Sequence, residues 1–177
     1  MNLICAKSEN DWVIARDILL QVIEHLNKNG KKLWSYKQAE IADLKSRYRL
    51  EELFFLSSEN EVCGMVFIQN IDPIFWSEIE IGESYFLHKL AVLPRFRGLG
   101  YGYRILDLAV NLATLNGIKY LRLDCDPRPE LISYYENYGF FVVSRVFVGG
   151  LPTVKFELLT SRCSITPAAL PLPLDSF

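Results

Sequence analysis

The residues with the clearest chemical potential lie in the glycine-rich segment RFRGLGYG, Arg95 to Gly102. It follows an apolar run and opens a run with helical periodicity. The glycines at 98, 100 and 102 allow a turn in which several backbone N–H groups converge. The start of a helix adds a partial positive charge there, and such an arrangement binds phosphate. The segment therefore predicts a phosphate-binding turn, with a plain strand-to-helix turn as the alternative.

Two other phosphate-binding loops are excluded by residue type. A Walker loop requires Lys and then Ser or Thr after its last glycine, whereas Tyr103 follows Gly102. A dinucleotide fingerprint requires G-x-G-x-x-G, and here the third glycine comes one residue early. The predicted anion is therefore not held in either of these ways.

Composition limits the classes of protein that this chain can represent. Its 177 residues, 50% of them apolar, favour a single globular domain. A net charge of -2 gives no electrostatic footprint for nucleic acid. No apolar run reaches the ~18 residues of a membrane span, and the first ten residues do not resemble a leader, so we expect a cytoplasmic protein with no membrane partner.

Cysteine and histidine usage argues against a metal. The four cysteines are widely separated with no C-x-x-C, and the chain has two histidines. We therefore expect no metal site, and a reducing compartment fits the cysteine pattern.

Hydrophobic periodicity predicts alternating strands and helices over residues 1–160. The first predicted helix begins at Ser8 and ends near Asn29-Gly30. The other predicted helices are Tyr36–Tyr48, Tyr103–Asn116 and Pro129–Asn137. The predicted strands are Asn2–Ala6, Glu52–Ser57, Val62–Gln69, Tyr85–Val92, Tyr120–Cys125, Phe140–Val148 and Thr153–Leu159. Residues 161–177 form a proline-rich tail, which we interpret as extended chain or as a strap onto a second copy in a homodimer.

Two motifs in this order resemble the GNAT superfamily of N-acetyltransferases. Arg97, Gly100 and Gly102 fit its Arg/Gln-x-x-Gly-x-Gly/Ala signature, and Tyr135 stands four residues before Gly139-Phe140 as in the family's last helix. The resemblance implies a single-domain α/β (α+β) fold. It has a mixed, mostly antiparallel sheet of six to seven strands, a splay between the fourth and fifth, and about four flanking helices.

The resemblance also implies acetyl-CoA as co-substrate. Backbone N–H groups of the glycine turn would hold its pyrophosphate, with Arg97 at the phosphate edge, and backbone groups of the preceding strand would pair with the pantetheine arm. The implied cofactor-binding residues are Leu90, Ala91, Val92, Arg97, Gly98, Leu99, Gly100, Tyr101, Gly102 and Tyr135.

Acetyl transfer to an amine needs a proton acceptor and a donor. His88 is the first candidate base, because imidazole titrates near neutral pH, and Glu83 is the second. Many relatives carry a glutamate at the position that aligns with Phe86, and many carry an asparagine where this chain has Arg128-Pro129. Tyr135 is implied as the acid that protonates the departing thiolate; core packing is the alternative for both Tyr135 and His88.

The acceptor is expected to be a small-molecule or peptide amine. Trp34, Tyr36 and Trp76 are candidate walls of its site, with surface or core packing as the alternative. A ping-pong route through Cys125 is disfavoured, because no histidine lies nearby in sequence. The other functions considered are a catalytically inactive acyl-CoA sensor or assembly module, and a tRNA-directed acetyltransferase, which the net charge disfavours.

Overall fold

A computed structural model describes residues 1–163; most of the proline-rich tail, and with it the predicted homodimer strap, lies outside the described residues. The four helices are α1 (Asn10–Lys28), α2 (Ile41–Arg47), α3 (Tyr101–Leu115) and α4 (Pro129–Tyr138). The strands are β1 (Asn2–Cys5), β2 (Leu53–Ser58), β3 (Glu61–Gln69), β4 (Ser84–Val92), β5 (Tyr120–Cys125), β6 (Phe141–Val148) and β7 (Leu151–Leu159). None of the helices in this described part is long and apolar enough to cross a membrane.

The strands form one seven-stranded sheet in the order β1-β2-β3-β4-β5-β7-β6. β4 and β5 pair in parallel, whereas the β1–β2, β2–β3, β5–β7 and β6–β7 pairs are antiparallel. Parallel pairing covers four residue pairs and ends at Leu87 opposite Leu123, although β4 continues to Val92. The predicted mixed sheet with a splay between its fourth and fifth strands is confirmed.

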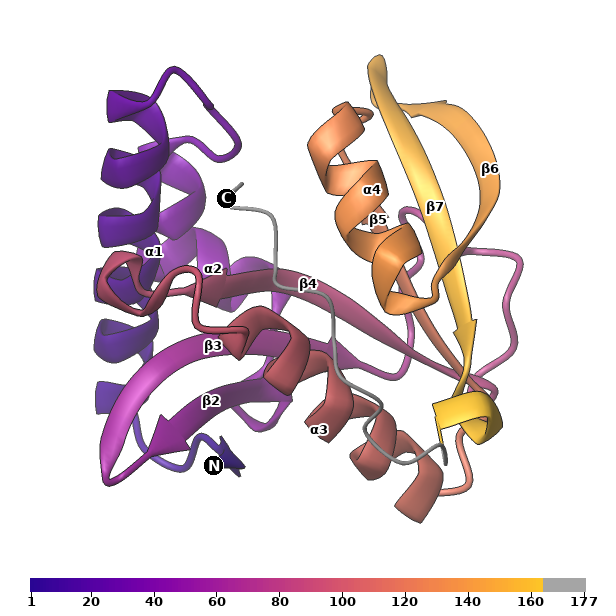
Figure 1. Ribbon diagram of the computed structural model, residues 1–177, viewed down its shortest axis with the longest axis horizontal. Helices are drawn as coiled ribbons and strands as arrows, with labels where there is room; N and C mark the ends of the chain where they lie inside the picture. The colour runs from indigo at the N-terminus through magenta and orange to yellow at the C-terminus, as the bar shows by residue number, and fades with distance from the viewer. Residues whose placement is uncertain (164–177) are drawn as a thin grey trace. The chain divides into compact units, whose positions relative to one another are not determined.

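The chain divides into two compact units. The first comprises residues 1–67 and 89–105. Its core forms where the apolar stripe of α1 meets α2, β2 and β3, and Figure 1 shows the two helices beside the β2–β3 hairpin. Leu19 and Ile23 of α1, Leu44 of α2 and Phe67 of β3 are among its buried side chains.

The second unit comprises residues 68–88 and the described chain from 106 onward. Helix α4 lies against β5 and β7 in Figure 1, with Leu131 turned into the core. It ends at Gly139, whose φ of 117° places it in the left-handed conformation that glycine adopts readily. The next residue, Phe140, is buried and enters β6.

The second predicted helix, Tyr36–Tyr48, is wrong as a continuous element. It consists of a short 3-10 turn, Tyr36–Ala39, followed by α2. The side chains of Ser35 and Gln38 form a reciprocal capping box around the first turn, and Glu40 then adopts an extended ψ of 138° that stops the helix. The apolar spacing spans this break, so periodicity alone does not reveal it.

Strand β4 continues through Lys89 to Val92, although Lys89 has a φ of 48°. A non-glycine residue at positive φ inside a strand marks a bulge, and side-chain alternation does not carry across it. On β3, Gly64 lies close to this part of β4: a Cβ placed on Gly64 would be 2.5 Å from the Ala91 carbonyl oxygen. The absence of a side chain at 64 therefore permits the approach of the irregular strand.

We expect Gly64→Ala to lower the free energy of unfolding by about 1–3 kcal/mol, because the added methyl group must displace backbone atoms of β4. Urea denaturation measures the change, with the exposed Ser133→Ala on α4 as the control. Wild-type stability in the Gly64 variant would show that β4 moves freely here.

Candidate active site

The glycine-rich turn has the conformation that the sequence predicts. A short 3-10 turn, Pro94–Phe96, leads to Arg97, which is extended, and Gly98 and Gly100 have φ values of 73° and 75°. Helix α3 starts at Tyr101, and the Arg104 N–H donates to the Gly100 carbonyl at 3.0 Å. The first turn of an α-helix presents backbone N–H groups toward its start, and a terminus of this kind can bind an anion.

The backbone of Leu90–Val92 belongs to the same unit as this turn. Ala91 is buried in the core beside α1, while Leu90 and Val92 are half-buried. Because pairing with β5 ends at Leu87, the backbone groups of these three residues have no registered partner in that strand.

Three ionisable side chains meet in the second unit, and we name them the Asp–His–Asp cluster: Asp72, His88 and Asp124. One donor atom from each lies within 4.8 Å of the other two. His88 and Asp124 directly follow Leu87 and Leu123, the last paired residues of β4 and β5, and Asp72 comes from the loop after β3. The end of parallel pairing therefore brings the two strand residues together.

Asp72 is held in a fixed orientation and is only 4% exposed. Its Oδ1 accepts hydrogen bonds from the N–H groups of Ile74 and Phe75, at 3.1 and 3.0 Å. Its Oδ2 lies 3.5 Å from His88 Nε2. The loop thus presents one carboxylate oxygen to the imidazole.

Burial and, after it, the nearby Asp72 carboxylate raise the pKa of Asp124 to about 7, against the opposing charge of Lys155. Its Oδ1 is buried and has no hydrogen-bond partner within the described part of the chain. A carboxyl group in this state exchanges its proton near neutral pH.

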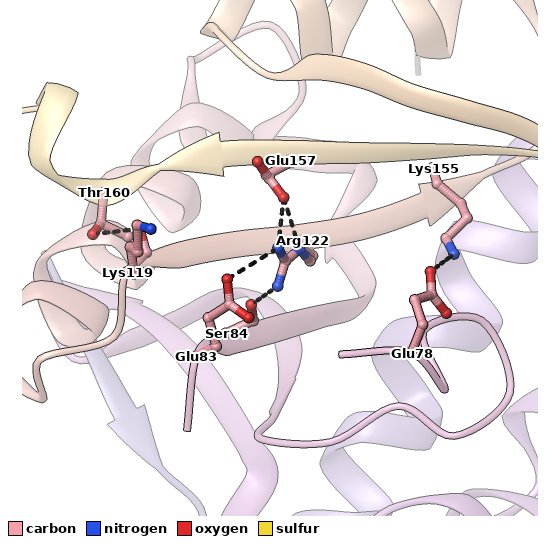
Figure 2. Close-up of polar contacts among 8 residues, drawn as sticks. All are labelled: Glu78, Glu83, Ser84, Lys119, Arg122, Lys155, Glu157 and Thr160. Atoms are coloured by element: carbon pink, nitrogen blue, oxygen red, sulfur yellow. Dashed lines mark hydrogen bonds and ion pairs between the residues drawn. The ribbon is translucent and has the colours of Figure 1, made fainter. Parts of the chain in front are cut away.

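Lys155 of β7 carries positive charge beside the cluster. It is 6% exposed, its Nζ lies 2.6 Å from Glu78 Oε1, and the same nitrogen lies 4.1 Å from the centre of the Trp76 ring. The hydrogen bond from Lys155 lowers the pKa of Glu78. Figure 2 shows this ion pair joining β7 to the loop before β4.

Arg122 of β5 organises a second polar network, also drawn in Figure 2. Its guanidinium donates to Glu157 Oε2 at 2.9 and 2.6 Å and to the Ser84 hydroxyl. Glu83, the second candidate base, lies 3.6 Å from the same group, at the entrance of β4. The structure therefore places Glu83 in an ion-pair network and His88 in the cluster.

Tyr135 lies on α4, with its ring against Phe140 and Phe156 at centroid distances of 5.8 and 5.6 Å. Burial of the hydroxyl raises its pKa, and the charges of Cys125 and Asp124 act in the same direction. Burial also raises the pKa of the Cys125 thiol to about 12. Both groups therefore keep their protons at neutral pH.

The three aromatic candidates for the acceptor site occupy different surroundings. Trp76 is 2% exposed and packs under Lys155. Trp34 is half-buried and contacts Lys89, whose Nζ lies 5.1 Å from its ring centre. Tyr36 is 52% exposed. Trp76 alone among the three is brought to the Asp–His–Asp cluster within the second unit.

Sequence reasoning missed Asp72, Asp124 and Lys155. They come from three segments without a fixed spacing, so no motif connects them. One signal was present: Asp124 interrupts the apolar strand LRLDC, and a charge in a covered strand needs a partner or a function.

We expect Asp124→Asn to remove a pH dependence of stability. Between pH 3.8 and about 7 the unfolded chain releases the Asp124 proton while the folded chain retains it, so wild-type stability falls as pH rises. From this group alone the fall is about 2–4 kcal/mol. Denaturation at pH 5 and pH 8 measures it, and a difference that persists unchanged in the variant would contradict the burial of this charge.

Known proteins share both the sequence pattern and the fold. Residues 19–140 match the model of the acetyltransferase (GNAT) family. An uncharacterized N-acetyltransferase, YesJ of Bacillus subtilis, is 28% identical over 130 residues, which cover 70% of this chain and 72% of that protein. A GNAT-family acetyltransferase of Listeria monocytogenes superposes with a TM-score of 0.72 at 20% identity, covering 89% of this chain and 93% of that one. The aminoglycoside acetyltransferase AAC(6')-Ib, solved with coenzyme A, superposes at 0.66 with 16% identity over 89% and 94% of the two chains. The chain belongs to the acetyltransferase (GNAT) family.

Proposed function

We propose that this acetyltransferase moves an acetyl group from acetyl-CoA to a primary amine of a small acceptor, by direct attack in a ternary complex. The observation that carries the proposal is the glycine turn with positive φ at Gly98 and Gly100, which opens α3. The backbone N–H groups of a helix's first turn point toward its start, where a diphosphate is stabilised.

The cofactor is held in two places. The N–H groups from Gly98 to Gly102 bind the pyrophosphate, with Leu99 and Tyr101 contributing backbone only, and Arg97 lies at the phosphate edge. The Leu90–Val92 backbone pairs with the pantetheine arm as an added strand would. The absence of a registered β5 partner along this stretch supports the second contact.

His88 accepts the proton of the acceptor. An alkylammonium with a reference pKa near 10.4 must lose a proton at neutral pH, at a cost of about 4.6 kcal/mol. The Asp72 carboxylate at 3.5 Å favours the protonated imidazole and supports His88 as the base, in preference to Glu83, whose carboxylate lies near Arg122.

Tyr135 donates the proton that the leaving thiolate takes up. Its raised pKa keeps the hydroxyl protonated until the tetrahedral intermediate collapses. The nitrogen loses two protons in all: one goes to His88, and the other restores the Tyr135 hydroxyl. Atoms and charges then balance with one proton released to solvent.

The high pKa of the Cys125 thiol supports direct attack over a ping-pong route through an acetylated cysteine. A thiol held protonated at neutral pH is a weak nucleophile. Trp34, Tyr36 and Trp76 remain the proposed walls of the acceptor site, of which Trp76 has the support of its place near the cluster.

An inactive acyl-CoA-binding module is the second candidate. It is favoured by Phe86, a 1% exposed aromatic at the position where many relatives carry a glutamate. Binding of acetyl-CoA without thiol release across a broad panel of amines would support this candidate.

Acetyl-CoA at 100 times its Kd should add about 2.7 kcal/mol to the free energy of unfolding, and Arg97→Ala should weaken this gain. Thermal shift with and without the nucleotide measures both. The control is Arg16→Ala, a partly exposed arginine on α1 paired with Asp17. No stabilisation of the wild type by acetyl-CoA would contradict the proposed cofactor site.

Tyr135→Phe should lower kcat while leaving acetyl-CoA affinity nearly unchanged, because it removes a proton and keeps the ring. Steady-state thiol release and isothermal titration separate the two effects. Tyr134→Phe, on the same helix, is the matched control. An unchanged kcat in Tyr135→Phe would remove this residue from the mechanism.

A further inference from the structure

The Asp–His–Asp cluster contains more proton-accepting groups than a single imidazole base requires. Asp72 is only 4% exposed, and its Oδ2 makes no hydrogen bond to the described residues. The same is true of the buried Asp124 Oδ1. A buried carboxylate oxygen without a donor costs free energy unless a proton or a cation satisfies it.

The nearby cations have other partners. The Lys155 ammonium is hydrogen-bonded to Glu78 and lies over Trp76, and the Arg122 guanidinium bonds to Ser84 and Glu157. Both cations are therefore paired elsewhere, and the Asp72 and Asp124 carboxylates, when ionised, favour positive charge on the His88 ring.

The geometry also favours the protonated ring. Asp72 Oδ2 lies 3.5 Å from His88 Nε2, and a carboxylate at this distance stabilises positive charge on the imidazole. Asp72 itself is fixed by the N–H groups of Ile74 and Phe75, so the orientation is built into the loop before any acceptor arrives.

We propose that Asp72, His88 and Asp124 work as one proton-accepting unit that serves acceptors whose amino group is an ammonium ion at neutral pH. His88 is the catalytic residue, and Asp72 and Asp124 are positioning residues that stabilise its protonated form. The inference rests on the proposed function and narrows its acceptor to the alkylamine class. In the step, the N–H bond of the ammonium breaks and the proton binds to His88, while the electron pair left on nitrogen forms the bond to the thioester carbon. The tetrahedral intermediate then loses a second N–H proton, its C–S bond breaks, and the leaving thiolate takes the proton of Tyr135, which the second N–H proton replaces.

Other titratable groups near the cluster set its charge. Lys155 of β7 opposes a proton there, and Glu78, bonded to Lys155, moderates that effect. Tyr135 of α4 and Cys125 of β5 are neutral at neutral pH, because burial raises the pKa of each. One proton, shared between His88 and the two carboxylates, is therefore the change that we propose for the cluster.

The chain has two histidines, which makes a direct test practical. Nitrogen-15 NMR follows the imidazole of His88 from pH 5 to pH 9 in the wild type, Asp72→Asn and Asp124→Asn. His25 on α1 is the internal reference, and Asp126→Asn, an exposed neighbour on the same segment, is the control variant.

We expect the His88 midpoint to fall by about one pH unit or more in Asp72→Asn and Asp124→Asn, and to stay in place in Asp126→Asn. The same spectra report whether each variant is folded. An unmoved midpoint in both cluster variants, or no titration of His88 in the wild type, would overturn the proposal, whatever the enzyme's activity.

Kinetics test the acceptor class with two probes of similar shape. Benzylamine is an ammonium ion at neutral pH, whereas phenylhydrazine is neutral. Asp72→Asn should lower kcat/KM for benzylamine about 100-fold and change that for phenylhydrazine by less than about threefold. An equal loss for both probes would show a merely structural role. Binding of acetyl-CoA without acetylation of any amine would refute the proposed function, while the NMR result would still decide the cluster.

Discussion

The short parallel pairing between β4 and β5 is the constraint on which the rest of the site depends. Four residue pairs hold the strands, and the pairing ends at Leu87 and Leu123. The next residues, His88 and Asp124, are therefore the first whose backbones no longer share a ladder, and their side chains meet Asp72 at that point. Just beyond this point Lys89 adopts a φ of 48°. The end of parallel pairing therefore determines where the three ionisable side chains meet.

Charge inside the second unit is arranged in two groups with different consequences. Around Arg122, opposite charges and a hydroxyl satisfy one another, so the network joins β4, β5 and β7. In the Asp–His–Asp cluster, carboxylate oxygens remain without donors. Buried ion pairs whose hydrogen bonds are satisfied specify how strands are arranged. Buried polar groups without partners cost folding free energy, and such groups are found at functional sites. Glu83 belongs to the first group and His88 to the second, a difference that their positions in the sequence do not show.

Much of the fold could be predicted from the sequence, because helices and strands here follow strong apolar periodicity. The β5 boundaries and the glycine turn agree with expectation, and the parallel unit follows from strand, helix and strand in succession. The break at Glu40 could not be predicted, since a backbone torsion and a local capping box cause it. Of the cluster, the sequence could indicate His88 as a candidate base. Its acidic partners come from a loop and another strand, and only the tertiary structure brings them together.

The Arg122 network also has a meaning for how such a protein can change over evolutionary time. Its guanidinium links Ser84, Glu83 and Glu157 near the start of β4, at the opposite end of the paired segment from His88. Because the strands are fastened at that end, substitutions beyond Leu87 do not threaten their register. Residues beyond that point can therefore vary while the scaffold stays intact, which suits a fold that this chain shares with solved acetyltransferases at sequence identities of 15% and 20%.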